Sequence, residues 1–421
     1  MIVGGGFAGL AATNALARHG VKITLIDRQN HHVFQPLLYE VATAGFASTT
    51  IAEPLRALVA KQRNVTVLMD DVVGIDPEAR LVRCSDSVLS YDYLIVAAGA
   101  GQSYFGHDEW AEYAPSLKTV EDALEIRQRL LSVFETAEKE RWSTAPTFVI
   151  VGGGATGVEL AGHIAELAHQ TLRRDFRNVV PTDARVLLIE GGDRILGGMS
   201  SSASREAHRQ LERLGVEVIT SLTVADIDAH QVRLTNGLII DAHFVAWAAG
   251  VAASPLGKLL GCALDRGGRV RVQPDLSVPG HPDIFVIGDM AACLQPDGLH
   301  PVPGVAPAAK QMGSYVGALI GTRVEQRTPP GPFVYRDYGA LATIGRNAAV
   351  ADLGRLKLWG RPAWLFWLFV HIMFLRCARL RLAAGATWLW RLSVGSRAAR
   401  LIIAPPPPAR PRASQSKTVR T

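Results

Sequence analysis

A glycine-rich turn between a predicted strand and a predicted helix constrains this chain more than any other feature. Residues 147–151, TFVIV, are mostly β-branched or aromatic, which indicates a strand buried on both faces. The pattern G-x-G-x-x-G follows at Gly152, Gly154 and Gly157, and residues 158–167 are predicted to form a helix. Glycines there allow a tight turn and let a pyrophosphate approach the helix N-terminus. The stretch therefore predicts a dinucleotide site.

The same pattern opens the chain. A short strand at residues 1–3 leads into a second glycine turn, and residues 10–19 and 21–26 predict a helix and another strand. Asp27 ends that strand about 20 residues after the glycines, which is where an acid bonds a ribose hydroxyl in dinucleotide-binding domains. The order of strand, turn, helix, strand and acid makes this signal specific. The glycines of this first turn are Gly4, Gly6 and Gly9.

The two parts of the chain repeat one order of motifs. Gly4 and Gly152 are 148 residues apart, and Gly99 and Gly250, which each end an apolar strand, are 151 apart. This near-constant offset predicts two copies of one dinucleotide-binding domain rather than two unrelated units. The acid of the second copy is Glu190, which lies 38 residues after Gly152, so we expect an insertion between that helix and its strand.

A third motif ends another apolar strand. Residues 283–289, DIFVIGD, end in Gly288 and Asp289, and the MAAC that follows is predicted to be helical. Asp289 is expected at the carboxyl edge of the sheet, where it would face a polar ligand. The alternative is that Asp289 caps the next helix.

Cysteine usage argues against several kinds of site. The four cysteines, at positions 84, 262, 293 and 377, form no C-x-x-C or similarly close pair. This argues against a disulfide framework, a zinc site and a redox-active dithiol, and it suits a reducing compartment. We therefore expect no metal site. The opening MIVGGG has no basic segment followed by an apolar one, which predicts no secretory signal.

The last part of the chain is basic and rich in tryptophan. From residue 353 onward there are 13 Lys or Arg and no Asp or Glu, and five of the eight tryptophans lie there. Of the 44 basic and 38 acidic residues in the chain, the remainder thus holds 31 basic against 38 acidic, a net charge of −7. A basic end on an acidic body predicts an anionic partner, either a membrane or a nucleic acid.

Two short apolar stretches favour the membrane. Residues 363–375, AWLFWLFVHIMFL, are apolar except for His371, but they are fewer than the roughly 20 residues that span a bilayer. A second apolar stretch ends at Trp390. Short helices with tryptophans and flanking arginines are typical of in-plane insertion at a membrane surface. Residues 355–400 are therefore predicted to bind a membrane and no nucleic acid; the alternative is a core helix.

These motifs together resemble the flavoproteins with two dinucleotide-binding domains, and most closely the type II NADH dehydrogenases. Those are single-subunit NADH:quinone oxidoreductases that do not pump protons. The resemblance covers nearly the whole chain through HHVFQPLLYEVATAG, LRRDF, VAWAAGVAASPL, PVPGVAPAAKQMG, LATIGRNAAVAD and PAWLFWLFVHI. It implies an α/β fold of two Rossmann-like domains, for FAD and NADH, with a C-terminal membrane-associating helical segment. It also implies a membrane quinone as acceptor, the cytoplasmic face of a bacterial inner membrane, and a homodimer.

The resemblance implies boundaries and roles. The FAD-binding domain would span residues 1–112 and 250–330, the NADH-binding domain 113–249, the C-terminal strands and membrane helices 331–403, and a disordered tail 404–421. FAD would be bound by Gly4, Gly6, Gly9, Asp27, Gly99, Gly288 and Asp289. NADH would be bound by Gly152, Gly154, Gly157, Glu190 and Gly250. Because a carboxylate at Glu190 repels a 2′-phosphate, a preference for NADH over NADPH is expected.

Glu159 is the predicted catalytic residue. It lies one turn inside the helix after the second glycine turn, and the resemblance implies a place beside the nicotinamide and flavin rings. Partial burial would raise the pKa of its carboxyl group and suit it to proton transfer. The alternative is a first-turn acid that only stabilises the helix dipole.

The predicted quinone region departs from the family pattern. Many members carry A-Q-x-A-x-Q where this chain has APAAKQ, so Pro307 replaces the first glutamine and Gln311 remains. A lysine that members often carry before the LATIG-type strand is Tyr338 here. The candidate residues near the quinone and flavin are Pro36, Ala306, Pro307, Lys310 and Gln311.

Other functions remain open from the sequence. A sulfide:quinone or other-donor oxidoreductase would share the fold but would need cysteines near the flavin. A membrane-bound NADH-binding protein with little turnover would keep both glycine turns, and the loss of a glutamine at Pro307 leaves that reading open. An NADH oxidase or ferredoxin reductase would not need the basic, Trp-rich end.

Overall fold

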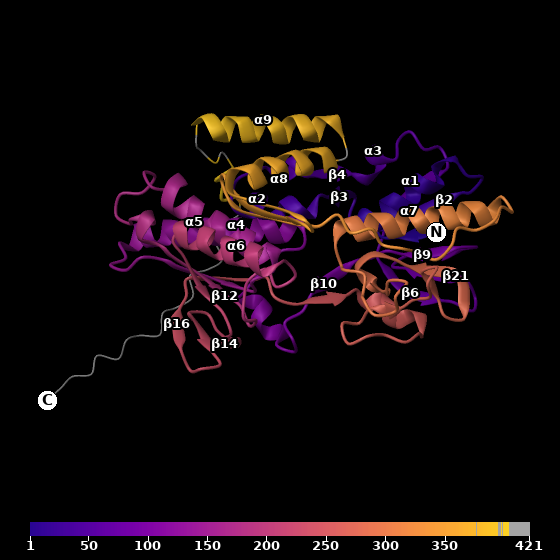
Figure 1. Ribbon diagram of the computed structural model, residues 1–421, viewed down its shortest axis with the longest axis horizontal. Helices are drawn as coiled ribbons and strands as arrows, with labels where there is room; N and C mark the ends of the chain where they lie inside the picture. The colour runs from indigo at the N-terminus through magenta and orange to yellow at the C-terminus, as the bar shows by residue number, and fades with distance from the viewer. Residues whose placement is uncertain (376, 395–396, 398, 404–421) are drawn as a thin grey trace. The chain divides into compact units, whose positions relative to one another are not determined.

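The computed structural model describes residues 1–375, 377–394, 397 and 399–403 (Figure 1). They divide into two compact units. The first unit comprises Met1–Gln35, Ile51–Gly106 and Gly250–Ala340, and the second comprises Pro36–Thr50, His107–Ala249 and Leu341–Thr421. The predicted disorder after residue 404 lies outside the described residues.

A six-stranded sheet forms the centre of the first unit, in the order β20-β21-β9-β1-β2-β5. All neighbouring strands pair in parallel except β20 with β21. The central strands β1 and β9 are apolar and buried along their whole length, as in LIV of β9, whereas the edge strand β5 is partly exposed. Their bounds are β1 Ile2–Val3, β2 Ile23–Asp27, β5 Val65–Met69, β9 Leu94–Val96, β20 Ser277–Val278 and β21 His281–Val286.

Two helices of the first unit cross at very short range. α1 (Phe7–Ala15) follows the first glycine turn, and α7 (Ala306–Val324) packs on it. A Cβ on Gly313 of α7 would lie 2.1 Å from the carbonyl oxygen of Ala8, so only glycine lets the backbones approach this closely. Smaller elements are β3 His31–Val33, β4 Ala52–Pro54, α3 Leu55–Leu58, β6 Val72–Asp76, β7 Leu81–Cys84, β8 Val88–Ser90, β10 Ala100–Gln102, β18 Val251–Ala253, β19 Val270–Arg271 and β22 Ala291–Ala292.

The second unit has a four-stranded parallel sheet in the order β13-β12-β11-β17. β11 (Thr147–Val151) has the bounds that the sequence predicts, and β13 comprises Val216–Ile219. The sheet packs with α5 (Ala155–Glu166), α4 (Val120–Glu140) and α6 (Ser201–Arg213). The other elements are α2 Leu38–Ala42, β12 Arg185–Ile189, β14 Val224–Ile227, β15 Gln231–Leu234, β16 Ile239–Asp241 and β17 Phe244–Trp247. This α/β arrangement confirms the predicted repeat of strand, turn and helix.

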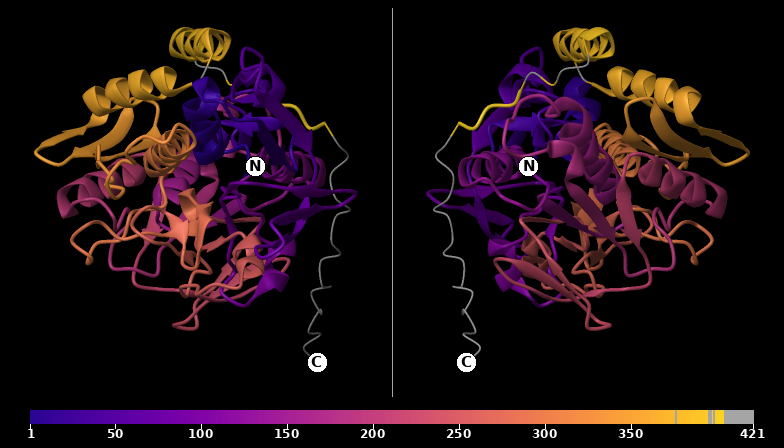
Figure 2. Two further views of the ribbon diagram at one scale, coloured as in Figure 1. Left: turned by 90° about the vertical axis from the view of Figure 1, so that its right-hand side faces the viewer. Right: turned by 90° about the vertical axis from the view of Figure 1, so that its left-hand side faces the viewer.

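The end of the chain forms a small sheet and two helices. β23 (Ala340–Gly345), β24 (Ala348–Leu353) and β25 (Leu356–Trp359) form the sheet. α8 (Gly360–Phe374) lies against β24, and α9 (Ala378–Val394) follows it (Figures 1 and 2). These helices confirm the two predicted apolar helical stretches.

One local prediction is wrong. The MAAC segment after Asp289 is not helical: a single 3-10 turn at Gly288–Met290 leads into β22, which pairs with β19. A tertiary neighbour decides the backbone there, and a short sequence window does not contain it.

Candidate functional site

The two glycine turns have the same geometry. Gly4 and Gly152 have φ angles of +104° and +109°, in the region that favours glycine. A Cβ on Gly9 would lie 1.8 Å from the carbonyl oxygen of Gly4, and one on Gly157 would lie 1.8 Å from that of Gly152. Each turn therefore packs tightly against the helix that follows, and only hydrogen fits between them.

The middle glycine of each turn faces open space. A Cβ on Gly6 or Gly154 would meet nothing within 4 Å. These residues begin α1 and α5, and neither helix has a side-chain cap. The first N–H groups of each helix can therefore bind an anion that approaches the bare backbone. Both turns fit a pyrophosphate.

An acid holds each turn from the next strand. Asp27 Oδ2 accepts the backbone N–H of Gly5 at 2.6 Å, and Glu190 Oε2 accepts that of Gly153 at 2.5 Å. The second oxygen of each acid accepts the N–H of the residue two positions after it, at 2.8 Å and 2.7 Å. A carboxylate has about four acceptor positions, so each acid keeps capacity for ribose hydroxyls. The 38-residue gap leaves the Glu190 geometry intact.

Gly288 and Asp289 follow the end of β21 in the first unit. Gly288 has a φ of +69°, and its N–H donates to Met312 Sδ of α7 at 3.2 Å. The suggestion that Asp289 caps a following helix is wrong, because β22 follows. Gly99 and Gly250 also have positive φ, and both lie in the first unit beside the antiparallel pair β10 and β18.

Helix α5 carries a buried row of titratable side chains. Glu159, His163 and Glu166 recur at helical spacing on one face and are at most 9% exposed. Strand β23 lies directly against this helix because Gly162 has no side chain: a Cβ there would lie 1.7 Å from the carbonyl oxygen of Ile344. Of this row, only Glu159 is predicted from the sequence as a functional residue.

Burial defines the chemistry of Glu159. Removal from water raises the pKa of its carboxyl group well above the ordinary value, and the negative charge of Glu40 raises this pKa further. The backbone N–H of Thr343 in β23 donates to Glu159 Oε1 at 3.5 Å and acts in the opposite direction. Burial therefore favours the protonated form of this carboxyl group, which supports the predicted burial and argues against a solvated first-turn acid.

Glu40 and His163 form a buried pair that the sequence analysis missed. His163 Nδ1 donates to the backbone carbonyl of Glu159 at 2.8 Å, and His163 Nε2 lies 3.7 Å from Glu40 Oε1. Tyr39 packs on the imidazole with ring centroids 4.5 Å apart. Glu40 lies in the HHVFQPLLYEVATAG segment, where no spacing rule links it to a helix more than a hundred residues later.

A second missed contact joins the end of the chain to α5. Arg397 Nη2 donates to Glu166 Oε2 at 2.5 Å, and both side chains are buried. Arg397 Nη1 donates to the carbonyl oxygen of Thr43 at 2.9 Å, and the backbone N–H of Arg346 donates to Glu166 Oε1 at 2.8 Å. The Arg397 side chain is thereby anchored in the interior of the second unit.

A small pocket lies beside this row. Glu40, His163, Thr343 and Arg346 line it together with three tryptophans of α8 and α9, at positions 364, 367 and 388. Its volume is about 20 Å³. Trp364, Trp367 and Trp388 are at most 6% exposed, so one face of the two helices belongs to the core.

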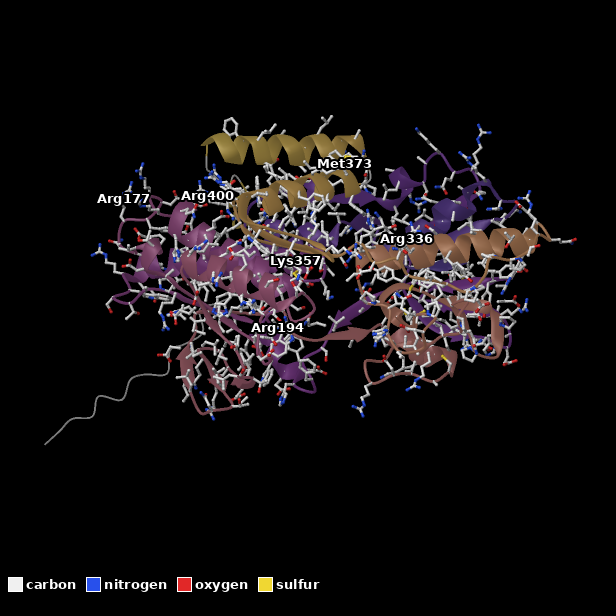
Figure 3. The ribbon with its side chains drawn as sticks, viewed as in Figure 1. Arg177, Arg194, Arg336, Lys357, Met373 and Arg400 are labelled. Carbon is white, nitrogen blue, oxygen red and sulfur yellow. The ribbon has the colours of Figure 1, made fainter. Side chains whose placement is uncertain are left out.

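The predicted quinone-region residues are mostly on α7. Ala306 and Pro307 occupy the first two positions of the helix, where proline needs no N–H partner. Lys310 Nζ lies 5.8 Å above the Phe7 ring. The Gln311 side chain donates to the carbonyl of Arg336 and accepts its N–H, both at 2.9 Å, so its amide orders the following loop (Arg336 is labelled in Figure 3). Pro36 belongs to the second unit.

The cysteines form no redox site. Cys84, Cys262, Cys293 and Cys377 are all free thiols. Burial raises the pKa of the Cys293 thiol to about 11, so it stays protonated and is a poor nucleophile at neutral pH. In the described part of the chain, no cluster of three His, Cys, Asp or Glu side chains could hold a metal ion.

The outer faces of α8 and α9 are apolar. Among the residues that the structure describes, no helix is long and apolar enough to cross a membrane. Large apolar side chains are nevertheless exposed on both helices, including Met373, which is labelled in Figure 3. The others are Leu365, Phe369, Phe374, Leu382, Leu389 and Trp390.

Comparison with known proteins places these features in a wider group. The model of the pyridine nucleotide-disulphide oxidoreductase family matches residues 1–313. The type II NADH:quinone oxidoreductases Ndh and NdhA of Mycobacterium tuberculosis are both 43% identical to this chain, and each alignment covers 92% of it and 86% of the relative. The demethylphylloquinone reductase NdbB of Synechocystis is 29% identical over 93% of this chain and 95% of its own.

Solved structures support the fold. NDH2 of Plasmodium falciparum, in complex with NADH, matches with a TM-score of 0.84 at 22% identity and covers 96% of this chain and 99% of its own. The sulfide:quinone oxidoreductase of Aquifex aeolicus matches with a TM-score of 0.74 at 19% identity, covering 93% and 94%. At such identities, the likeness concerns the fold.

Proposed function

This chain belongs to the type II NADH:quinone oxidoreductases, and from that premise we propose which residues carry out the reaction. It is an oxidoreductase that passes electrons from NADH to a quinone, with FAD as its cofactor. The observation that carries the residue assignment is the duplicated turn, in which an open middle glycine and an acid recur with the same geometry.

The first unit binds FAD and the second binds NADH in this proposal. Gly4, Gly6, Gly9 and Asp27 hold the adenosine and pyrophosphate of FAD, and Gly288, Asp289 and Gly99 complete that site. Gly152, Gly154, Gly157 and Glu190 hold NADH, with Gly250 at the edge. Support comes from the bare helix N-termini and the remaining acceptor capacity of the acids. The bound flavin supplies hydride and electron transfer.

Glu159 donates a proton to the quinone. A carboxyl group that stays protonated near neutral pH can supply the proton that quinone reduction requires. Its burial and the neighbouring charge of Glu40, which both raise its pKa, support this role. Quinone residues on α7 would be Ala306, Pro307 and Lys310, and Pro36 is a further candidate. Gln311 is held by Arg336 and would contribute by ordering that loop.

Substitution of Glu159 tests the proposal. Rapid mixing follows flavin bleaching by NADH and, separately, the return of flavin colour when a quinone analogue is added. We expect Glu159→Gln to slow the second step by about 10²–10⁴-fold, the usual contribution of a positioned acid, and to leave the first step unchanged. Glu212→Gln on the surface of α6 is the control. Wild-type rates in both steps for Glu159→Gln would refute the role.

The C-terminal helices bind the membrane surface in this proposal, as a peripheral anchor on the cytoplasmic face of the inner membrane. Support comes from the exposed apolar side chains of α8 and α9 and from the absence of acidic residues after position 353. Arginines at the helix ends would meet anionic headgroups. A homodimer is also proposed, and sedimentation of the purified protein in detergent tests it.

A further inference from the structure

Glu40 and His163 form a buried pair that can hold a proton and pass it on. His163 Nδ1 must carry hydrogen, because its partner, the Glu159 backbone carbonyl, can only accept. In a neutral ring Nε2 is then a bare acceptor, and Glu40 Oε1 lies 3.7 Å from it. Both side chains are buried. A proton that enters the pair can sit on either the carboxyl group or the imidazole, and the two groups then titrate as a unit.

The adjoining pocket has the size and chemistry of a water site. Its volume of about 20 Å³ exceeds the roughly 10–15 Å³ that one water needs and falls far below the roughly 150 Å³ cavity that accepts a benzene ring. Glu40, His163 and Arg346 supply polar groups around the pocket.

An unsatisfied donor points to an occupant. The indole Nε1 of Trp367 is buried and has no hydrogen-bond partner among the described residues. Trp367 lines the pocket and is 1% exposed. A buried N–H without a partner is unfavourable, and an ordered water that accepts from it would satisfy it.

We propose that the pocket holds an ordered water and that Glu40 and His163 relay a proton from it to Glu159. The overall reaction takes up one proton: NADH + H⁺ + quinone gives NAD⁺ + quinol. Glu159 gives its proton to the quinone oxygen and becomes a carboxylate. Glu40 then reprotonates Glu159, and the pair recovers its proton from the pocket water, which bulk solvent replenishes. This relay rests on the proposed role of Glu159.

The charges around the pair suit a relay. Glu159 and Glu166 lie on the same helix, Arg346 lies beside the pocket, and Arg397 neutralises Glu166. On α8, burial lowers the pKa of His371 to about 4, so that ring is neutral at pH 7. Glu40 is close enough for its charge to raise the pKa of Glu159. A proton on Glu159 is thus favoured whenever the pair can supply one.

Variants of the pair give a pH signature. The quinone-dependent return of flavin colour is measured in the holoenzyme from about pH 5.5 to 9.5, across the range in which imidazole and buried carboxyl groups titrate. We expect His163→Gln to be at least about tenfold slower near pH 8 but close to wild type near pH 5.5. The reason is that the variant lacks the imidazole, the group of the pair that exchanges protons near neutral pH, whereas at low pH solvent protons can reload Glu159 without it. Glu40→Gln should be slow throughout.

Two controls separate the relay from a structural role. His208, which pairs with Glu212 at 3.4 Å on the surface of α6, is the matched histidine, and His208→Gln should keep the wild-type profile. Added imidazole should restore the rate of His163→Ala, since it can enter the enlarged pocket. An unshifted profile in His163→Gln, a wild-type rate in Glu40→Gln, or no rescue by imidazole would overturn the relay.

The water is tested without turnover. A crystal structure of the holoenzyme should show density within hydrogen-bond distance of Trp367 Nε1, and an empty pocket would overturn the proposal even if a His163 variant fails to fold. The two proposals fail differently. If Glu159→Gln has wild-type kinetics, the proton-donor role of Glu159 is wrong. If Glu159→Gln is slow but the pair variants match wild type at every pH, only the relay is wrong.

Discussion

At the scale of single residues, the positions that matter most are those where a side chain is absent or its charge is suppressed. Gly162 allows β23 to approach α5, and this approach covers Glu159 and brings the Thr343 N–H to it. The result is a carboxyl group whose pKa is well above its ordinary value. Gly162 and Glu159 therefore act together. Gly162 lets β23 exclude water, and the exclusion of water favours the protonated form of the Glu159 carboxyl group.

Glu159 makes stability depend on pH. Since its pKa is higher in the folded state than in the unfolded state, folding binds a proton, and stability falls as pH rises from the unfolded pKa of about 4.3 through the folded pKa. We expect Glu159→Gln to raise the midpoint of thermal unfolding relative to wild type, with a larger gain at pH 8 than at pH 5. Calorimetry at both pH values measures this difference. Equal gains at the two pH values would contradict the raised pKa.

At the scale of elements, Arg397, which follows α9, joins parts of the second unit that are distant in sequence. Arg397 supplies the positive charge for Glu166 and also bonds the backbone of Thr43 beside α2. The guanidinium of Arg397 therefore links its own segment to Thr43 and to Glu166, although the three are far apart in the sequence. The outward faces of α8 and α9 have no such role, which divides each helix into a core face and a solvent face.

Removing Arg397 should destabilise the second unit. Arg397→Met leaves the Glu166 carboxylate buried without its partner, and breaking a buried ion pair on one side costs about 3–5 kcal/mol. Urea unfolding followed by circular dichroism measures this. The double variant Arg397→Met with Glu166→Gln should recover much of the loss, because no charge remains to be paired. A double variant no more stable than Arg397→Met would contradict the explanation.

The outer faces of α8 and α9 should govern membrane binding. Leu382 and Leu389 are 74% and 67% exposed, so replacing both by Glu changes the surface without disturbing the core and adds repulsion from anionic lipid. We expect the double variant to lose most of its flotation with anionic vesicles, while NADH bleaching of the flavin stays normal. Glu replacements at the exposed positions Val73 and Val88 of the first unit are the control. Unchanged flotation would refute the helix proposal.

At the scale of the whole molecule, the sequence predicts what depends on local order and misses what depends on distant contacts. Both glycine turns, their acids and the buried strands follow from spacing, because a turn, its helix and the next strand are close in sequence. Glu40, His163 and Arg397 could not be predicted together, since their segments meet only in the folded second unit. The helical prediction for MAAC failed for the same reason: pairing with β19 decides it.

The tryptophans of β25, α8 and α9 make the intrinsic fluorescence of the protein sensitive to membrane binding. Of the eight tryptophans, only Trp359 and Trp390 are exposed, at 43% and 58%, while Trp364, Trp367 and Trp388 are buried. Indole emits at longer wavelength in water and at shorter wavelength in an apolar medium. Trp390, which lies on the outer face of α9, therefore contributes to the longer-wavelength part of the fluorescence and would touch lipid. Docking can be read as a blue shift, with no label attached and with the buried tryptophans as an internal reference.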